Sequence, residues 1–293
     1  MIPERGPYLV EAVRYIDRFK GQLVVIKVGG ELIDGGPVIS RIIKQVAVLS
    51  RLGLRPLVVH GGGVQVDLAC QAKGLTFTKR HGRRITSKDV LAVMLEEIGG
   101  TLNEAIVSGL QAVEIEAIGH REGITQAVRC TRRGTTIVDG EEVDWGEVGD
   151  INSIRADAFP AKEQWVVPVL PSLGFSDDGN WFNVNADAVA AQVAVHLQAT
   201  KLVILTRVAG VIQDLDAAGP ISQLSVDQAK ELLNSPAVAG GMRAKLQEAI
   251  RALEGGVGRV HIISGREPYT LLREIFTDEG SGTLVHNERE LKP

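Results

Sequence analysis

Cysteine, aromatic residues and long apolar runs are all scarce in this sequence. Its 293 residues include only two cysteines, Cys70 and Cys130, with no CxxC pair and no zinc-ligand spacing, so we expect free thiols and a reducing compartment. No apolar run approaches the roughly 20 residues that cross a bilayer, and the first residues lack the basic-then-apolar pattern of a signal peptide. We therefore predict a cytoplasmic protein with no membrane partner.

A net positive charge and the common nucleotide-binding motifs are also lacking. The formal net charge of −4 gives no general electrostatic reason to expect nucleic acid as a partner. Neither GxxxxGK(S/T) nor a GxGxxG after a strand occurs, so neither a Walker-type loop nor a dinucleotide fingerprint is supported. Glycine, in contrast, is abundant, and many of the 33 glycines stand where a predicted strand ends.

Alternating strands and helices define the predicted fold. Short apolar runs end at glycines and are followed by helical stretches, which predicts an α/β fold with a mainly parallel central sheet covered by helices on both faces. The expected strands are 23–28, 57–60, 165–170, 202–206 and 260–263, and the expected helices are 37–52, 87–109, 187–198, 225–234, 241–254 and 268–276. Short alternating runs over 120–150 predict hairpins at the rim of the sheet.

Three regions are expected along the chain. Residues 7–19 place apolar side chains at helical spacing, so residues 1–20 are predicted to form an extra helix in front of the main fold. No low-complexity linker follows it. We expect two lobes, 21–180 and 181–293, that share one continuous sheet.

Two glycine turns follow the first two predicted strands. Lys27 stands near the end of the first strand, before Gly29 and Gly30, and the second strand ends in His60-Gly61-Gly62-Gly63. Backbone without Cβ atoms can approach a phosphate closely, and a helix N-terminus adds N–H donors. The alternative is an ordinary turn beside a lysine that extends to solvent. His60 is interpreted as a packed strand-end residue without a chemical role.

Polar residues gather at two further helix starts. Asn183 to Asp187 place two amides and a carboxylate before an apolar helix, which favours a site, although Asp187 could simply cap that helix. Gly240 to Lys245 place Arg243 and Lys245 in a first turn, where cations oppose the helix dipole unless an anion lies nearby. Exposed lysines also occur at such positions in ordinary helices.

Together these motifs resemble the amino acid kinase family, from about residue 9 to residue 285. The resemblance rests on Lys27-Val28-Gly29-Gly30, His60-Gly61-Gly62-Gly63, Gly82-Arg83-Arg84-Ile85-Thr86, Asn183-Val184-Asn185-Ala186-Asp187, Gly241-Met242-Arg243-Ala244-Lys245 and Phe276-Thr277-Asp278-Glu279-Gly280-Ser281-Gly282-Thr283. It implies a three-layer αβα sandwich and an enzyme that transfers a phosphoryl group from ATP to a carboxylate. The members that it resembles most phosphorylate N-acetyl-L-glutamate in arginine biosynthesis, with Mg²⁺ held through ATP rather than by protein ligands.

The resemblance also implies roles for individual residues. Two lysines flank the transferring phosphoryl group in this family and an aspartate holds them in place, which corresponds to Lys27, Lys245 and Asp187. The expected substrate-binding residues are Gly61, Gly62, Arg84 and Asn183, and the expected nucleotide-binding residues are Gly29, Gly30, Thr206, Gly210, Gly241 and Met242. Arg83 is expected to be a solvated surface residue.

The leading helix resembles one carried by arginine-inhibited, hexameric members of the family. The residues that fall where such members bind arginine are Lys201, His261, Glu274 and Gly280. Inhibition by arginine is therefore expected, together with assembly as a homodimer or as a hexamer built from three dimers. The alternative is a helix that only pads the sheet or builds a dimer.

Three positions depart from the family pattern. Arg207 stands where Asp is usual, Glu104 stands where Lys is common, and residues 117–123 replace the usual Gly-Leu-Ser-Gly-x-Asp-Gly. The first change could alter nucleotide use, and the other two could alter the substrate accepted. Three alternatives therefore stay open: the kinase-like part of an acetylglutamate synthase, a non-catalytic arginine sensor, and a kinase for an acylated aminoadipate.

Overall fold

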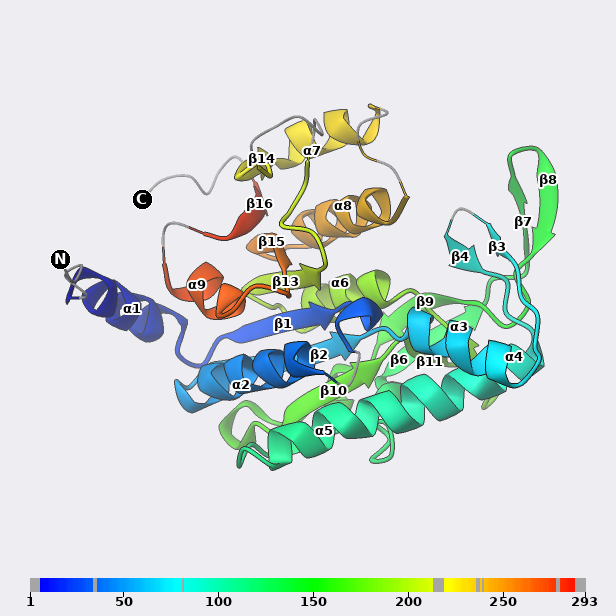
Figure 1. The fold of residues 1–293 in the computed structure, drawn as a ribbon, viewed down its shortest axis with the longest axis horizontal. Helices are drawn as coiled ribbons and strands as arrows, with labels where there is room; N and C mark the ends of the chain where they lie inside the picture. Colours follow the sequence, from blue (N-terminus) through cyan, green and yellow to red (C-terminus); the bar gives the residue numbers. More distant parts are fainter. Residues whose placement is uncertain are drawn as a thin grey trace.

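A central eight-stranded sheet organises the molecule in the computed structural model, which describes residues 6–33, 36–80, 82–212, 219–235, 238, 240–277 and 280–287. Its strand order is β14 (Gln223–Ser225), β16 (Gly282–His286), β15 (Arg259–Ser264), β13 (Lys201–Thr206), β1 (Leu23–Val28), β2 (Arg55–His60), β10 (Val167–Pro171) and β5 (Ala117–Ile118). All neighbours pair in parallel except β15 and β16. The predicted mainly parallel sheet is confirmed (Figure 1).

Helices cover both faces of this sheet. One face carries α2 (Pro37–Arg51), α5 (Asn103–Gln111) and α9 (Thr270–Phe276), and the other carries α6 (Ala186–His196), α7 (Val226–Leu233) and α8 (Gly240–Glu254). Side chains alternate along a strand, so β1 contributes to a hydrophobic core on each face of the sheet. Val24 and Ile26 pack with α2, α5 and α9, and Leu23 and Val25 pack with α6, α7 and α8. Every residue of β1 is buried, as in a strand covered on both faces. This is the predicted three-layer αβα sandwich.

Smaller β elements surround one end of the sheet. A four-stranded sheet has the order β12 (Trp181–Asn183), β11 (Leu173–Phe175), β6 (Val128–Arg132) and β9 (Gly149–Ile154), and two hairpins pair β3 (Lys79–Arg80) with β4 (Arg83–Arg84) and β7 (Thr135–Val138) with β8 (Glu141–Asp144). The prediction of hairpins over 120–150 is confirmed. Figure 1 places both hairpins across from α8.

A long helical stretch replaces the single regular helix expected over 87–109. It runs through α4 (Lys88–Met94), the π-helical segment η2 (Leu95–Leu102) and α5. Gly99 lies in the π segment, where an added Cβ would come within 3.0 Å of the His120 ring. The wider π turn and the missing side chain therefore let His120 pack directly against the helix.

Helix α1 (Gly6–Phe19) precedes the sheet, as predicted, and lies at one end of the molecule, next to α9 (Figure 1). Phe19 at its end is buried in the core on the α2 side of the sheet. The remaining helices are α3 (Gly63–Ala72) and the short 3₁₀ turns η1 (Gly30–Leu32), η3 (Ile124–Ala127), η4 (Ala156–Ala158) and η5 (Lys162–Gln164). Within the described ranges, no helix has the length and apolar character needed to cross a bilayer.

Candidate active site

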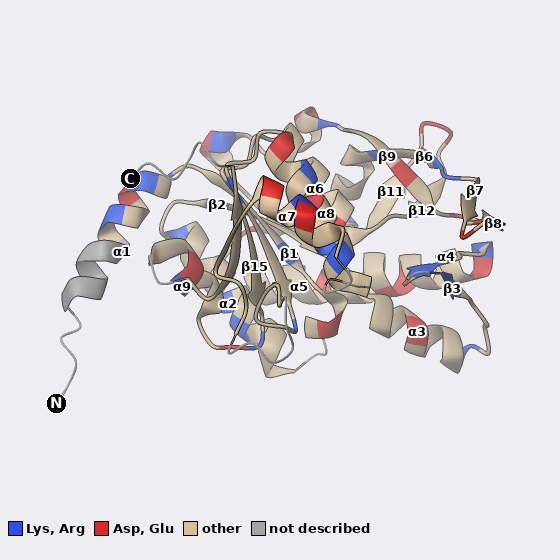
Figure 2. Ribbon diagram, turned by 90° about the horizontal axis from the view of Figure 1, so that it is seen from above, with Lys and Arg blue, Asp and Glu red and all other residues tan. Residues whose placement is uncertain are grey.

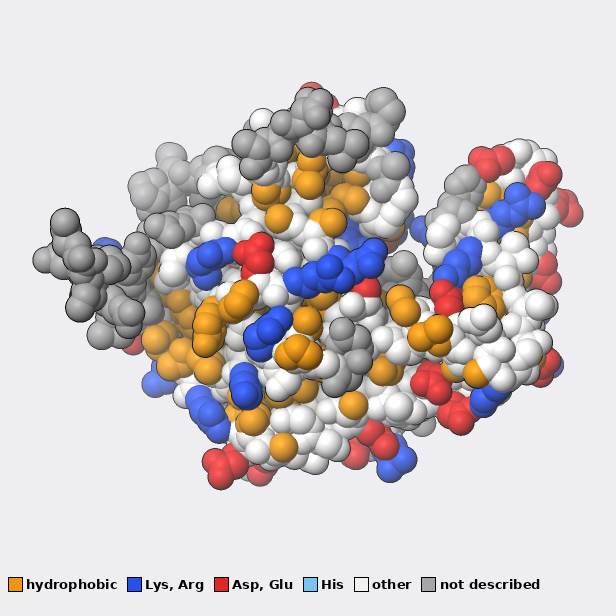
Figure 3. Space-filling model, in the orientation of Figure 1, with side chains coloured by type: hydrophobic (Ala, Val, Ile, Leu, Met, Phe, Trp, Pro, Cys, Tyr) orange, Lys and Arg blue, Asp and Glu red, His pale blue; other side chains and the backbone are white. Residues whose placement is uncertain are grey.

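A cleft of about 920 Å³ opens where several parallel strands end. The ends of β1 and β2, the starts of α3, α6 and α8, and the β3–β4 and β7–β8 hairpins all contribute to its lining. Figure 2 marks Lys and Arg positions in blue on α8 and on β3. Figure 3 shows the hollow between α8 and the hairpins, with basic side chains along its edge. The cleft is thus suited to an anionic ligand.

Two lysines converge on one aspartate in this cleft. Lys27 Nζ lies 2.9 Å from Asp187 Oδ1, and Lys245 Nζ lies 3.4 Å from Asp187 Oδ2. Lys27 comes from the end of β1, Asp187 from the first turn of α6 and Lys245 from the first turns of α8. All three side chains are largely shielded from solvent, at 6%, 7% and 13% exposure for Lys27, Asp187 and Lys245. This is the convergence that the resemblance to the amino acid kinase family implied.

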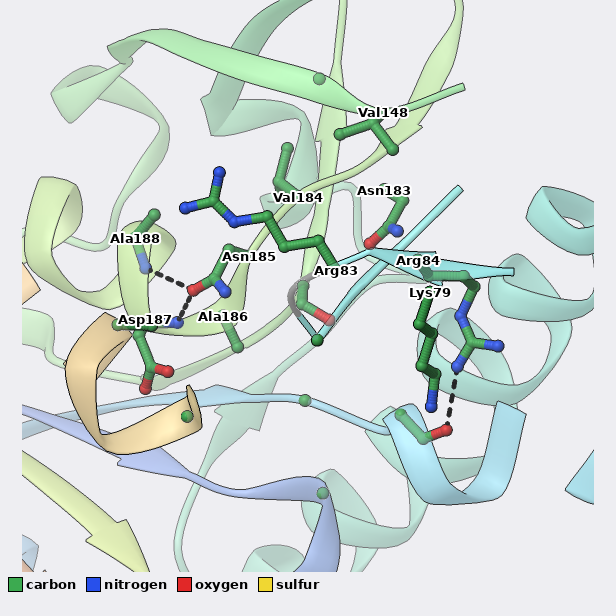
Figure 4. A pocket seen from close by; sticks show the side chains of 18 of the residues that line it. Lys79, Arg83, Arg84, Val148, Asn183, Val184, Asn185, Ala186, Asp187 and Ala188 are labelled. Carbon is green, nitrogen blue, oxygen red and sulfur yellow. Dashed lines mark hydrogen bonds between the residues drawn. The ribbon is translucent and has the colours of Figure 1, made fainter. Parts of the chain in front are cut away.

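Asp187 is free for this contact because another residue caps α6. The side-chain oxygen of Asn185 accepts hydrogen bonds from the backbone N–H groups of Asp187 and Ala188, at 2.8 Å and 3.1 Å (Figure 4). The alternative interpretation of Asp187 as the helix cap is therefore wrong. Its carboxylate instead points to the two ammonium groups.

The charge on Asp187 is stabilised by its partners. Burial favours the neutral acid, but the ammonium groups of Lys27 and Lys245 outweigh it and hold the pKa of Asp187 below its ordinary value. The aspartate is therefore ionised at neutral pH and keeps two like charges close together. Such a group positions cations and is a poor proton donor.

The two glycine turns touch each other at the floor of the cleft. A Cβ on Gly30 would lie 2.8 Å from the backbone nitrogen of Gly62, closer than packed atoms allow. Gly61 is fixed by its own N–H, which donates to the carbonyl of Val28 at 3.2 Å. The missing side chains thus let the ends of β1 and β2 form one surface of backbone beside Lys27.

Arg84 and Asn183 lie at the other end of the cleft. Arg84 Nη2 lies 2.6 Å from Asp67 Oδ1 and donates to the carbonyl of Gly63 at 3.1 Å, and its guanidinium stacks on the Phe77 ring. Its other terminal nitrogen, Nη1, is buried and has no partner among the described residues. Asn183 Nδ2 donates to Thr86 Oγ1 at 2.9 Å. An unpaired, buried guanidinium nitrogen is suited to a ligand carboxylate.

Arg83 was given no role from the sequence, yet it lines the cleft. Neighbouring residues of a strand point to opposite sides, so Arg84 faces α3 while Arg83 extends toward Asn185 and Ala188 (Figure 4). Glu248 and Arg251 were also missed. They form an ion pair of 2.7 Å on the cleft side of α8. Their spacing of three and six residues from Lys245, on one helix face, was the available signal.

A sequence model of the amino acid kinase family matches residues 22–264, most of the chain. The chain belongs to the amino acid kinase family. It is 35% identical over 285 residues to the acetylglutamate kinase of Caldicellulosiruptor saccharolyticus, with 97% of each chain covered. The acetylglutamate kinase of Myxococcus xanthus is 36% identical over 301 residues, covering 99% of this chain and 97% of that one.

Solved structures of the family agree with the observed fold. N-acetylglutamate synthase from Neisseria gonorrhoeae, complexed with coenzyme A and N-acetyl-glutamate, has a TM-score of 0.84 and 30% identity over 96% of this chain. The same synthase with coenzyme A and L-arginine has a TM-score of 0.82 at 28% identity, also over 96% of this chain. This chain spans 63% and 65% of those synthase chains. Giardia carbamate kinase, 15% identical, covers 92% of this chain and 99% of its own with a TM-score of 0.64, and shares the fold.

Some of the expected nucleotide residues lie outside the cleft lining. Gly30 and Gly241 line it, whereas Gly29, Thr206, Gly210 and Met242 do not. Thr206 is buried at the end of β13, and Met242 packs against the core beneath α8. Arg243 donates to the carbonyl of Leu233 and is not among the lining residues either.

The positions that depart from the family pattern also lie outside the lining. Arg207 is exposed after the end of β13. Glu104 forms an ion pair with Arg121, and Glu122 accepts a hydrogen bond from the backbone N–H of Gly119 at 2.6 Å. Neither Glu104 nor Glu122 is among the residues that line the cleft.

A second group of charged residues is buried between β15 and α9. His261 Nδ1 lies 2.6 Å from Glu274 Oε1, and Glu274 Oε2 accepts a hydrogen bond from the Ser281 hydroxyl at 2.8 Å. Lys201 Nζ lies 4.2 Å from the centre of the Phe19 ring. Gly280 stands beside Glu274 with a φ of +62°. Of the four residues expected to bind arginine, Glu274 belongs to α9, and His261 and Gly280 lie beside it. Lys201 lies against Phe19 at the end of α1.

Proposed function

We propose that this chain phosphorylates the side-chain carboxylate of N-acetyl-L-glutamate with MgATP, which forms the acyl phosphate used in arginine biosynthesis. The observation that carries the proposal is the placement of Lys27 and Lys245 on either side of Asp187, beside two glycine turns. The 34–38% identity to acetylglutamate kinases over nearly the whole chain supports the choice of substrate.

The chemistry requires charge stabilisation more than proton transfer. A substrate carboxylate is already ionised at pH 7 and attacks phosphorus without a general base. The obstacle is the approach of two anions and the charge that spreads over the phosphoryl oxygens. Lys27 and Lys245 are placed to neutralise that charge, and Asp187 keeps their ammonium groups together. Mg²⁺ carried by ATP would neutralise the β- and γ-phosphates.

The acyl amino acid is assigned to the part of the cleft built by residues 21–180. We assign its reacting carboxylate to the glycine turn of Gly61 and Gly62, where the Gly62 N–H is available because that of Gly61 already donates to Val28. Its other carboxylate is assigned to Arg84 and Asn183. The buried, unpaired Arg84 Nη1 supports this assignment. Residues 181–293 would hold most of the nucleotide, through Thr206, Gly210, Gly241 and Met242. Gly29 and Gly30, from the other lobe, are also assigned to the nucleotide.

The test is direct detection of the acyl phosphate. Purified protein is mixed with MgATP, N-acetyl-L-glutamate and hydroxylamine, and the acyl hydroxamate is measured. Product that depends on ATP, on Mg²⁺ and on this substrate is expected. Product with an acylated aminoadipate but not with N-acetyl-L-glutamate would change the substrate, and no product with any acylated acidic amino acid would favour a non-catalytic sensor.

Arginine is the second proposed ligand, at the cluster of Lys201, His261, Glu274 and Gly280. Burial lowers the pKa of His261, so its neutral ring donates from Nδ1 to Glu274, while His261 Nε2 is buried without a partner among the described residues. A buried carboxylate beside a lysine suits a ligand that carries both a guanidinium and a carboxylate. The structural similarity to a synthase complexed with L-arginine supports this assignment.

Removal of residues 1–17, which keeps Phe19 against Lys201, tests both arginine binding and assembly. We propose a cytoplasmic homodimer or hexamer in which α1 contributes to the larger assembly, since Val13 on this projecting helix is 49% exposed. Hydroxamate formation without arginine should persist in the truncated protein while arginine inhibition is lost and the mass by light scattering falls. Inhibition that is unchanged by the truncation would contradict the role of α1.

A further inference from the structure

His60 lies directly before the glycine turn assigned to the reacting carboxylate, and it is completely buried. Its Nδ1 lies 3.0 Å from the carbonyl oxygen of Gly61, the next residue in the chain. A carbonyl oxygen can only accept, so Nδ1 must carry the proton. The imidazole therefore donates a hydrogen bond into the backbone of the turn.

Asn103 fixes the other ring nitrogen of His60. Its Oδ1 accepts from the backbone N–H of His120 at 2.7 Å, so its Nδ2 must face the opposite way. That nitrogen lies 2.9 Å from the carbonyl oxygen of Val169 and 3.0 Å from His60 Nε2. With a donor opposite it, His60 Nε2 must accept. Every partner is consistent with one arrangement only, the neutral ring protonated at Nδ1.

Burial supports the neutral ring. It lowers the pKa of His60 to about 4, and the nearby His120 acts in the same direction. The hydrogen bond to Gly61 acts in the opposite direction and does not outweigh burial. At neutral pH the ring is therefore a fixed dipole rather than a charge or a base.

The consequence lies on the other side of the peptide bond. The Gly61–Gly62 peptide is planar, so a carbonyl held inward by His60 directs the Gly62 N–H the opposite way. That side faces Gly30 and the cleft, and no described residue accepts a hydrogen bond from this N–H. A peptide between two glycines flips easily unless something outside it holds the carbonyl. His60 supplies that restraint.

We infer that His60, oriented by Asn103, is a positioning residue that locks the Gly61–Gly62 peptide so that the Gly62 N–H points at the acceptor carboxylate. The inference rests on the proposed function. His60 touches no reacting atom, and its effect should appear in the affinity for the acyl amino acid rather than in the affinity for MgATP.

Three substitutions separate positioning from packing. An asparagine amide can stand where Nδ1 stands, so His60→Asn keeps a donor to Gly61. His60→Gln places its amide where Nε2 stands and loses the donor to Gly61. His60→Leu loses that donor and also the acceptor for Asn103. His286→Gln is the control, because His286 is also buried at a strand end with Nδ1 3.2 Å from the carbonyl oxygen of the following residue, away from the cleft.

For His60→Gln and His60→Leu we expect the KM for N-acetyl-L-glutamate to rise on the order of tenfold, the effect of one misplaced donor to a charged group. The KM for MgATP should stay within about twofold, and His60→Asn should recover most of the loss. An unchanged KM in folded His60→Gln would overturn the inference, as would equal losses for both substrates or losses matched by His286→Gln.

The wild-type protein provides a second measurement that needs no variant. Imidazole ¹⁵N shifts between pH 6 and 8 should show His60 protonated at Nδ1 and unprotonated at Nε2. A ring protonated at Nε2, or an imidazolium at pH 6, would overturn the inference. If the wild type forms no hydroxamate with any acylated amino acid, the proposed function fails and this inference fails with it, a result distinct from an active enzyme that is indifferent to His60.

Discussion

Lys245 is the residue whose contribution to the reaction is easiest to isolate. It sits on α8, is 13% exposed, and its ammonium group reaches Asp187 from the side opposite Lys27. Lys245→Ala should lower kcat by about 10²–10³-fold, the usual effect of removing one preorganised group that stabilises transition-state charge. This fall in kcat is measured from the steady-state rate of hydroxamate formation.

Lys230→Ala is the matched control for that variant. Lys230 is a half-exposed lysine on α7 that pairs with Glu254 and does not line the cleft. An exposed pair of this kind contributes little, so turnover should stay within about twofold of wild type. Equal losses in the two variants would remove Lys245 from the mechanism.

Asp187 should contribute to stability as well as to catalysis. Asp187→Asn leaves two buried ammonium groups without their counter-charge, and breaking a buried pair costs about 3–5 kcal/mol. The folded-state pKa is depressed, so this stabilisation is present above the unfolded-state value of 3.8 and is lost as pH falls through the folded-state value. Urea unfolding at pH 7 and below pH 4 should show a difference between wild type and variant that shrinks in acid. A difference independent of pH would contradict this charge assignment.

At the scale of elements, local hydrophobic patterns in the sequence predicted helices and strands correctly. Features that depend on contacts with residues distant in the chain were missed. The run of β1 and the apolar pattern over residues 7–19 are local signals, and β1 and α1 begin at or within one residue of them. Residues 1–5 of the predicted helix lie outside the described residues. The π segment η2 was missed because the local pattern is that of a regular helix, whereas the close approach of His120 to Gly99 involves a residue outside the segment. Asn185 rather than Asp187 caps α6 for a similar reason, since two lysines from other elements hold the aspartate.

The junction between α1 and β13 should have its own pH dependence. Lys201 is buried against Phe19, and burial, with Arg259 nearby, lowers its pKa to about 7. Between pH 7 and the unfolded-state value of 10.5 the unfolded chain binds more protons, so stability rises with pH there. Lys201→Met removes the cost of burying a charge. It should therefore be more stable than wild type at pH 7, by a margin that narrows toward pH 10.

Denaturant unfolding of wild type and Lys201→Met at pH 7, 8.5 and 10 measures this margin. Comparing the two proteins cancels the titration of the other groups. Lys230→Met is the control, because Glu254 raises the pKa of exposed Lys230, the direction opposite to that of Lys201. The stabilisation from this pair should therefore hold as the pH rises toward the unfolded-state value of 10.5. A constant margin for Lys201→Met would mean that Lys201 is charged in the folded state throughout.

At the scale of the whole molecule, the site combines residues from both of the predicted lobes, whose strands lie in one eight-stranded sheet. Lys27 belongs to residues 21–180, and Asp187 and Lys245 belong to 181–293. That they meet was expected from the resemblance to the amino acid kinase family, and it is consistent with a fold in which the ends of parallel strands gather at one edge of a sheet. The sequence could not predict which loops would enclose the cleft. The position of the β7–β8 hairpin and the direction of Arg83 depend on packing between segments distant in sequence.

The shared sheet also predicts how the molecule unfolds. β1 pairs with β2 on one side and with β13 on the other, in continuous parallel register, and both helix layers pack across that junction. Neither half can expose this junction without losing buried apolar surface, so the halves should unfold together. In a Trp181→Phe background, fluorescence of Trp145 and Trp165 reports on residues 21–180. Hydrogen exchange of β15 amides reports on the other half. The two probes should give one midpoint in denaturant, and separated midpoints would mean that the lobes are independent folding units.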